Sequence, residues 1–222
     1  ACLAQDKTSR VACETLVKSN MVIIAGELTT KAVIDPEKIA RQAIREIGYC
    51  NRQDDDVFHA DTVFFTNLLT EQSPDIAQGV DAREAEGKGH AEQGAGDQGI
   101  MFGYAKNEPG FDCCYMPLAI KLAHKILSNL SQARHRKEIC GLGPDAKSQV
   151  TVEYDDNGHP VGIRKIVVST QHSPDMTLNE LRPLVKKYIA AALPDGWMPQ
   201  DDNILINPTG RFVIGGLYGA AR

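Results

Sequence analysis

The sequence RVACETLVKSNMVIIAGELTT, residues 10–30, decides the class of fold. Two runs rich in strand-forming residues, 10–17 and 21–30, flank a short polar connection, and this pattern predicts a β-hairpin. Glu14 and Glu27 stand inside these otherwise apolar strands, where an unpaired buried carboxylate would cost several kcal/mol. Each acid therefore lies on the solvent face of the hairpin or faces a ligand or a cation.

A helix and a third strand follow the hairpin. Asp35 before Pro36 is typical of a helix start, because aspartate caps the first turn and proline needs no backbone donor there. Apolar residues then recur at helical spacing as far as Gly48, which predicts a helix over 36–47. Residues 57–69, with a valine and two phenylalanines at their centre, predict the next strand.

The same order of elements recurs in the second half of the chain. An apolar stripe first predicts a helix over 117–136. The later predicted elements are a hairpin of strands 147–154 and 161–170 around the turn Asp155-Asp156-Asn157-Gly158, a helix over 177–193, and short strands over 203–206 and 211–214. Hairpin, helix and strand thus occur twice, over 10–70 and 147–214, which indicates an internal structural repeat.

This order predicts an α+β protein made of repeated sheet-plus-helix units, with helices packed on one face of mostly antiparallel sheets. We expect one unit over residues 1–112 and a second over 113–222, with intertwining of the two units as the alternative. A chain of 222 residues is long enough to bury a core in each.

A glycine-rich stretch, Glu92 to Ala105, precedes the second group of elements. Four glycines among small, acidic and amide side chains allow the backbone to approach a ligand closely, which predicts a binding loop leading into a strand. The alternative is a simple turn, since neither a Walker A loop nor a dinucleotide fingerprint is present. The charged and small residues 81–90 just upstream, His90 included, predict a mobile lid.

Composition bears on whether the protein binds nucleic acid, crosses a membrane or lies in an oxidising compartment. The net charge of −5 argues against a nucleic-acid partner, and no run of the roughly 20 apolar residues needed for a membrane span occurs. The sequence shows no signal-peptide pattern. Six cysteines at irregular spacings predict reduced thiols rather than disulfides or zinc ligands, and the adjacent Cys113 and Cys114 are expected to serve packing. The six histidines also lack metal-ligand spacing, so we expect a cytoplasmic protein without a histidine metal site.

Five segments carry a resemblance to a known family. They are 72–80, 92–105, 144–150 (PDAKSQV), 168–172 (VSTQH) and 207–216 (NPTGRFVIGG). In order and spacing they closely resemble S-adenosylmethionine synthetase, the methionine adenosyltransferase family, over about residues 10–216. The resemblance implies that methionine sulfur attacks the ribose 5′ carbon of ATP and that the displaced triphosphate is cleaved to pyrophosphate and phosphate. A sulfur nucleophile needs no base, so alignment and cations on the leaving triphosphate must supply the catalysis.

The resemblance also implies roles for particular residues. It places three residues at methionine-binding positions and four at ATP-binding positions: Glu27, Gln78 and Asp97, and Asp145, Lys147, Arg211 and Phe212. Lys147 is the implied catalytic residue because it brings positive charge to the nucleotide, and the ring of Phe212 offers a stacking face for adenine. Glu14 matches a potassium ligand. Residues 78–93 correspond to a gating loop.

The family's pattern is only partly represented in this sequence. Its His-Pro-Asp-Lys motif, its triphosphate-gripping loop and a third domain have no counterpart here, so most ligands of Mg²⁺ are missing, although the resemblance implies both Mg²⁺ and K⁺ as cofactors. It also implies ATP and methionine as substrates, and a homodimer or homotetramer with shared active sites. The alternative is a non-catalytic, synthetase-like protein that serves in binding or oligomerisation.

Overall fold

The structure is a computed structural model that describes residues 1–50, 58–75, 77, 83–84, 91–92, 99–111 and 115–216, with the backbone alone for 83–84 and 91–92. The chain divides into two compact units. Unit 1 comprises Ala1–Ala43 and Ala60–Gly103, and unit 2 comprises Ile44–His59 and Tyr104–Arg222. The boundary predicted between residues 112 and 113 stays a prediction.

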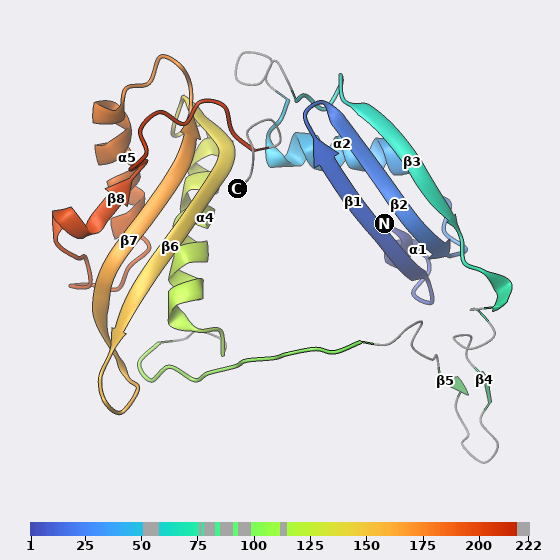
Figure 1. Ribbon diagram of the computed structural model, residues 1–222, viewed down its shortest axis with the longest axis horizontal. Coiled ribbons are helices and arrows are strands. Elements are labelled where there is room, and N and C mark those ends of the chain that lie inside the picture. Colours follow the sequence, from blue (N-terminus) through green and yellow to red (C-terminus); the bar gives the residue numbers. More distant parts are fainter. Residues whose placement is uncertain are drawn as a thin grey trace. The chain divides into compact units, whose positions relative to one another are not determined.

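Unit 1 is built on a three-stranded sheet (Figure 1). β1 (Arg10–Lys18) and β2 (Met21–Thr29) form the predicted hairpin as an antiparallel pair. β3 (Phe64–Glu71) lies parallel to β2, so the strand order is β1-β2-β3. A four-residue helix, α1 (Cys2–Gln5), precedes the hairpin and has no counterpart in the elements predicted from the sequence.

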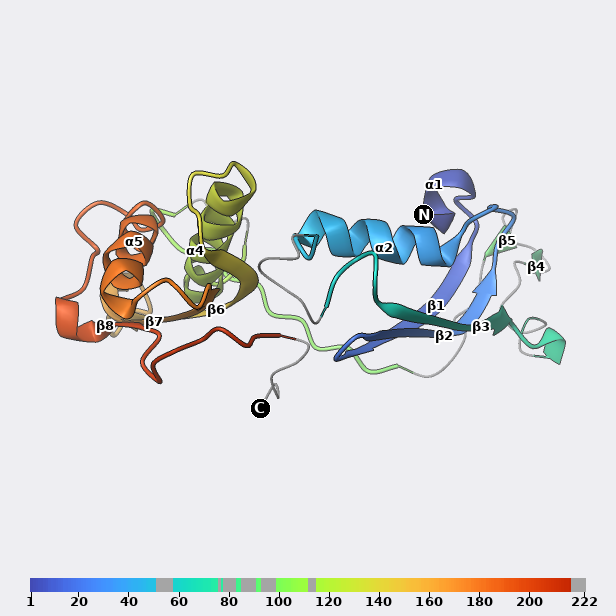
Figure 2. The ribbon, with the colours of Figure 1, turned by 90° about the horizontal axis from the view of Figure 1, so that it is seen from above.

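Helix α2 (Pro36–Ile47) matches the predicted helix residue for residue. Asp35 caps it as expected, because its carboxylate accepts a hydrogen bond from the Lys38 N–H at 3.0 Å. Ile44 is buried, whereas Ile39 and Ile47 of the predicted apolar stripe are 39% and 52% exposed. The helix lies on one side of the sheet, so the other face of β1, β2 and β3 carries no helix in the described part of unit 1 (Figure 2).

The strand predicted over 57–69 begins later in the structure. Residues 58–63 form turns and bends, and β3 starts at Phe64. The guanidinium of Arg41 on α2 explains the difference, since it donates to the carbonyls of Ala60 at 2.6 Å and Val63 at 3.1 Å. These carbonyls are satisfied by a side chain 19 and 22 residues away, a contact that a local apolar pattern does not reveal.

Unit 2 repeats the arrangement with longer hairpin strands and a shorter third strand. β6 (Leu142–Tyr154) and β7 (Pro160–His172) form the second predicted hairpin, and β8 (Ile204–Ile206) lies parallel to β7 in the order β6-β7-β8. Helix α5 (Leu178–Ala190) connects β7 to β8 and begins at Thr177, which forms a capping box with Glu180. A short 3₁₀ helix, η1 (Asp201–Asn203), precedes β8.

The core of unit 2 lies between its sheet and two helices. Helix α4 (Leu118–His135), the predicted helix before the hairpin, lies with α5 on one face of the sheet (Figure 2). The core side chains include Leu118, Leu122, Ile126, Leu130, Val150, Ile166, Val168, Leu181, Val185 and Ile189. Alternate residues of β6, such as Val150, enter this core, so the residues between them, Lys147 included, lie on the face without helices.

The predicted α+β class and the structural repeat are confirmed. In both units the second strand pairs antiparallel with the first strand and parallel with the third. The parallel pair arises because a helix lies between the second and third strands and returns the chain in its original direction. Each sheet is therefore mixed, with one antiparallel and one parallel pair, where the sequence predicted mostly antiparallel sheets.

One predicted strand, residues 211–214, does not form. This segment follows β8 without pairing into the sheet ladder. Two of its backbone groups instead bond to side chains at the end of β7: the Phe212 N–H donates to His172, and the Val213 carbonyl accepts from Gln171. The Phe212 carbonyl also accepts from the His172 backbone N–H, but no ladder of such bonds forms, so the segment keeps an irregular backbone.

Only part of the predicted lid over 81–90 is described. β4 (Arg83–Glu84) and β5 (Ala91–Glu92) form a short antiparallel pair. The remaining residues of the gating segment 78–93 lie outside the described residues. None of the described helices is both long enough and apolar enough to cross a membrane.

Candidate functional site

The helix-free face of unit 1 carries both acids predicted from the sequence. In the β1–β2 register Glu14 lies opposite Ala25, and Glu27 lies opposite Ala12. The two pairs are two positions apart along the strands, so the two acids are diagonal neighbours on one face, a relation that places Cα atoms about 7–8 Å apart. Val22, which is buried, belongs to the opposite face. Both acids are exposed, so neither is a buried, unpaired charge.

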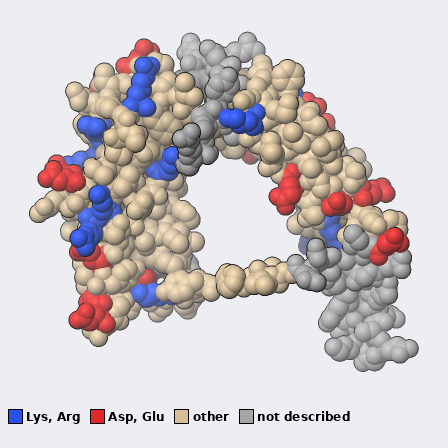
Figure 3. All heavy atoms as spheres, in the orientation of Figure 1, with Lys and Arg blue, Asp and Glu red and all other residues tan. Residues whose placement is uncertain are grey.

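Large apolar side chains surround the two acids on this face. Leu16, Met21, Phe64 and Leu68 share the face by register and are 56%, 42%, 69% and 56% exposed. Figure 3, which views unit 1 from this side, shows a surface of mostly uncharged residues with Asp and Glu among them. An exposed apolar face of this kind marks a surface that binds a partner or a ligand.

The carboxylate oxygens on this face suit K⁺ better than Mg²⁺. Glu14, the predicted potassium ligand, presents exposed carboxylate oxygens, which are the ligands that hard cations prefer. Among the described residues no group of three or more His, Cys, Asp or Glu could hold a metal ion. Among the described residues, Glu14 can therefore offer one carboxylate to K⁺, but no group of three or more ligands is present for Mg²⁺.

Two predicted methionine-binding residues, Gln78 and Asp97, lie outside the described residues, as do Cys113 and Cys114. The same holds for residues 93–98 of the glycine-rich stretch. Residues from Gly99 onward are described, and the strand expected after the glycine-rich loop does not form over 99–105. The apolar residues that predicted it, Ile100 to Phe102, are at least 85% exposed and have no neighbouring strand within the described residues.

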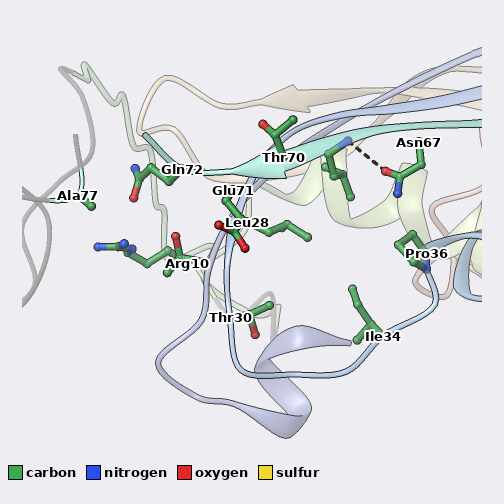
Figure 4. A pocket seen from close by; sticks show the side chains of 12 residues that line it. Arg10, Leu28, Thr30, Ile34, Pro36, Asn67, Thr70, Glu71, Gln72 and Ala77 are labelled. Atoms are coloured by element: carbon green, nitrogen blue, oxygen red, sulfur yellow. Dashed lines mark hydrogen bonds between the residues drawn. The ribbon is translucent and has the colours of Figure 1, made fainter. Parts of the chain in front are cut away.

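A pocket of about 550 Å³ opens in unit 1 near the ends of β2 and β3 (Figure 4). Arg10 and Gln72 lie toward the left of the view, and Ile34 and Pro36 lie toward the right. The side-chain oxygen of Gln72 is buried without a hydrogen-bond partner among the described residues. None of the predicted site residues lines this pocket, although Gln72 and Ala77 belong to the segment 72–80 that carries the family resemblance.

In unit 2 the structure brings Asp145 and Phe212, two of the candidate ATP-binding residues, close together. Asp145 lies on β6, and its carboxylate accepts a hydrogen bond from the Gly216 N–H at 2.6 Å. Gly215 is packed between the two predicted residues: a Cβ placed on it would stand 3.1 Å from both Asp145 Oδ2 and Phe212 Cε2. The absence of a side chain at Gly215 therefore allows the ring and the carboxylate to approach the same point.

Gln171, near the end of β7, joins the two sides of this arrangement. It is buried, its Nε2 donates to the Val213 carbonyl at 3.0 Å, and its Oε1 accepts from the Asp145 N–H at 3.4 Å. A Cβ on Gly143 would stand 2.5 Å from that Oε1, so this glycine also leaves necessary space. Sequence reasoning assigned no role to Gln171; its local signal is a polar side chain that ends an otherwise apolar strand.

The two cations predicted for ATP binding are exposed. Lys147 lies opposite Ser169 on the helix-free face of unit 2, two positions along β6 from Asp145. Arg211 directly precedes Phe212. Neither cation forms an ion pair or hydrogen bond with any residue that the structure describes, so both are available to an anionic ligand.

The fold and the site define an α+β protein of two hairpin–helix–strand units, with carboxylates on the helix-free face of one unit and cationic, acidic and aromatic groups gathered on the other. Residues 1–74 match the N-terminal domain of S-adenosylmethionine synthetase, and residues 92–212 match its central domain. The chain belongs to the S-adenosylmethionine synthetase family, the family of methionine adenosyltransferases.

Individual relatives agree with this assignment. The chain is 68% identical to an S-adenosylmethionine synthase of Akkermansia muciniphila over 219 residues, which are 99% of this chain and 55% of that protein. It is 48% identical to the corresponding proteins of Lacticaseibacillus casei, over 96% of this chain and 54% of the relative, and of Rhodospirillum centenum, over 99% and 54%. The chain thus spans about half the length of the curated relatives that it matches.

Proposed function

We propose that this chain provides methionine-binding and nucleotide-binding parts of an S-adenosylmethionine synthetase. The enzyme transfers the adenosyl group of ATP to the sulfur of methionine and releases phosphate and pyrophosphate. The observation that carries the proposal is family membership through both units, since the matches over 1–74 and 92–212 contain candidate residues for both substrates.

The methionine side of the proposed site is the acidic face of unit 1. Glu27 is exposed on this face, where its carboxylate can bind the ammonium group of methionine. The apolar side chains on the same face, Leu16 and Leu68 among them, give the thioether a hydrophobic surface. Gln78 and Asp97 complete the methionine side in this proposal, on the basis of the family resemblance alone.

The nucleotide side is the cluster at the end of β6 and β7 in unit 2. Phe212 offers a ring face to adenine, and Asp145 can accept hydrogen bonds from the nucleoside. Lys147 and Arg211 are unpaired cations within the described part of the chain, and they can neutralise the phosphates of ATP. Catalysis then consists of aligning the sulfur with the ribose 5′ carbon and stabilising the negative charge that develops on the leaving triphosphate.

Cations contribute a separate part of the proposal. Glu14 would hold K⁺ beside the methionine face, where the ion offsets the negative charge of two neighbouring carboxylates. Mg²⁺ would neutralise triphosphate charge when bound. The described residues contain no cluster that fits Mg²⁺, so their own part in the reaction is to bind and orient the two substrates.

We further propose that the protein is a homo-oligomer, a homodimer or homotetramer, in the cytoplasm. The exposed apolar face of unit 1 supports the first point, because a two-fold contact would remove Leu16, Phe64 and Leu68 from water. Four free cysteines within the described ranges support a reducing compartment: Cys2, Cys13, Cys50 and Cys140.

The function is tested by following radiolabelled methionine into S-adenosylmethionine with ATP, Mg²⁺ and K⁺, using the protein purified from its natural source and recombinant variants of it. Lys147→Ala should lower kcat/KM about 100-fold, because a charge-assisted contact to the nucleotide is lost. Lys125→Ala, an exposed lysine on α4, is the matched control and should stay within about twofold.

Three outcomes would contradict parts of this proposal. No product from the natural protein would reject the synthetase activity, and labelled methionine and ATP would then test the alternative of a non-catalytic binding protein. Equal activity of the Lys147→Ala and Lys125→Ala variants would reject the role of Lys147. The 222-residue chain alone is expected to form no product, so turnover that survives repurification would show that it needs no further phosphate-binding groups.

A further inference from the structure

His172, the last residue of β7, makes two hydrogen bonds to the backbone of one residue. It is 4% exposed. Its N–H donates to the Phe212 carbonyl at 2.9 Å, and its ring Nε2 lies 3.1 Å from the Phe212 nitrogen, whose N–H donates to it. The only two backbone hydrogen-bonding groups of Phe212 are thus both bonded to His172.

These contacts determine which nitrogen of the imidazole ring carries the hydrogen. A backbone N–H can only donate, so Nε2 must be the unprotonated ring nitrogen. Nδ1 therefore carries the hydrogen of the neutral ring, and it lies 3.0 Å from the Ser173 carbonyl, to which it donates. Both ring nitrogens are bonded to backbone, so the ring is held in one orientation.

The bonds to His172 determine where the Phe212 side chain stands. With its N–H and carbonyl fixed, the backbone of Phe212 has little freedom to rotate, and its ring is directed to the point beside Gly215 and Asp145. Gln171, the preceding residue, holds the next carbonyl, that of Val213. Two successive residues of β7 thus order a segment that has no strand partner.

We propose that His172 is a positioning residue for the nucleotide: it sets the place of the Phe212 ring, and of Arg211 beside it, before ATP binds. This inference rests on the proposed function, because it takes Phe212 as the residue that contacts adenine. The physical reason is preorganisation, since a segment that is already ordered loses less conformational entropy when its ligand binds. His172 itself is buried behind this backbone and acts through Phe212 rather than on the substrate.

Two substitutions separate positioning from simple packing. The side-chain amide of His172→Gln can place an oxygen near the position of Nε2 and accept the Phe212 N–H. The shorter amide of His172→Asn reaches the position of Nδ1, so it can still bond the Ser173 carbonyl but leaves the Phe212 N–H without an acceptor. A buried donor without a partner is strongly disfavoured, so the segment should detach in the asparagine variant.

The first measurement is amide hydrogen exchange of Phe212, which requires no enzymatic activity. We expect the exchange rate to rise at least about tenfold in His172→Asn and to stay within about threefold of the wild type in His172→Gln. Unchanged protection in His172→Asn would show that the ring does not hold this segment. Equal loss of protection in both variants would show that His172 serves as core packing, and would equally overturn the proposal.

The second measurement is made on the natural protein, with ATP binding by equilibrium dialysis and steady-state kinetics side by side. We expect His172→Asn to weaken ATP binding and raise the KM for ATP about tenfold, to leave the KM for methionine unchanged, and to be rescued by His172→Gln. Lost protection at Phe212 with unchanged ATP affinity would reject the nucleotide role alone. Wild-type protein that binds ATP but makes no product would reject the proposed reaction and leave this inference standing, whereas no ATP binding would reject both.

Discussion

Asn207 offers a quantitative test of how unit 2 is held together. It is 1% exposed, its Oδ1 accepts from the Thr170 N–H at 2.8 Å, and its Nδ2 donates to the Thr170 carbonyl at 3.0 Å. Its φ of 44° is in the left-handed region, which asparagine tolerates better than alanine. Asn207→Ala leaves two buried backbone groups of Thr170 unbonded, at about 1–3 kcal/mol each, and adds about 1 kcal/mol of backbone strain. We expect unit 2 to lose about 3–7 kcal/mol of unfolding free energy.

The assay for this prediction is urea unfolding followed by tryptophan fluorescence. The single tryptophan, Trp197, lies in unit 2 with its ring 5.0 Å from that of Phe111, so its emission reports the unfolding of this unit. Asn157→Ala, in the exposed β6–β7 turn, is the matched control and should change stability by less than about 0.5 kcal/mol. A loss below about 1 kcal/mol for Asn207→Ala would refute the account, because water or neighbouring groups would then be satisfying Thr170.

A second variant at this position separates the donor from the acceptor. Asn207→Asp keeps an acceptor for the Thr170 N–H, but its ionised carboxylate cannot donate to the Thr170 carbonyl. Burial raises the pKa of the introduced carboxyl in the folded state, and the protonated form can donate again. The stability deficit relative to the wild type should therefore shrink as the pH falls, and a deficit that grew on acidification would contradict this geometry.

Three further predictions concern a carboxylate in unit 1, a buried charge in unit 2 and the exposed face of unit 1. The backbone N–H of Lys31, followed by donors from Thr8, lowers the pKa of Asp6 in the folded state. The contribution of Asp6 to stability is therefore complete above its unfolded pKa of about 3.9 and is lost as the pH falls toward the lower folded value. Asp6→Asn should flatten the acid dependence of the unfolding free energy. Tyr154→Phe removes the hydroxyl that donates to buried Glu108 at 3.0 Å and should cost about 1–3 kcal/mol in urea unfolding. Phe64→Lys should shift the oligomer toward monomer in analytical ultracentrifugation, because it places a charge on an apolar face.

The first two of these predictions have a control variant in the same unit or on the same type of residue. Asp35→Asn keeps an N-cap for α2, so it should leave the acid dependence of unfolding closer to the wild type than Asp6→Asn does. Tyr104→Phe, at a residue that is 74% exposed, should be nearly neutral. Unchanged sedimentation of Phe64→Lys would place the contact between subunits elsewhere, and equal effects of the two tyrosine variants would reject the role of the Glu108 bond.

Local signals were sufficient for the elements whose ends are determined locally. The helix over 36–47 was predicted residue for residue because its N-cap, Asp35, and its terminating Gly48 are adjacent to it in sequence. Both hairpins were predicted for the same reason, since their turns join strands that are neighbours in the chain. The shared face of Glu14 and Glu27 then follows from the register of the first hairpin.

Contacts between distant residues explain the parts that were missed. The start of β3 depends on Arg41, and the irregular backbone of 211–214 depends on Gln171 and His172; each of these contacts joins residues at least 19 positions apart, so no local pattern identifies the partner. The parallel third strand of each sheet also depends on how a helix packs rather than on the pattern of the strand itself. The candidate site residues Asp145 and Phe212 were indicated only by the family resemblance, because they lie on β6 and on the segment after β8, far apart in the sequence.

The contacts between the end of β7 and residues 212–213 join residues far apart in the sequence, and this separation has a consequence for protein synthesis. The bonds from His172 to Phe212 and from Gln171 to Val213 join residues 40 and 42 positions apart. At about 5–20 residues per second, the ribosome adds that length of chain in roughly 2–8 s. During this interval β6 and β7 can already pair with each other. The side chains of Gln171 and His172 at the end of β7, however, still lack Val213 and Phe212 as partners. Translation speed therefore sets how long a nascent chain exposes the polar end of β7 to solvent and to chaperones.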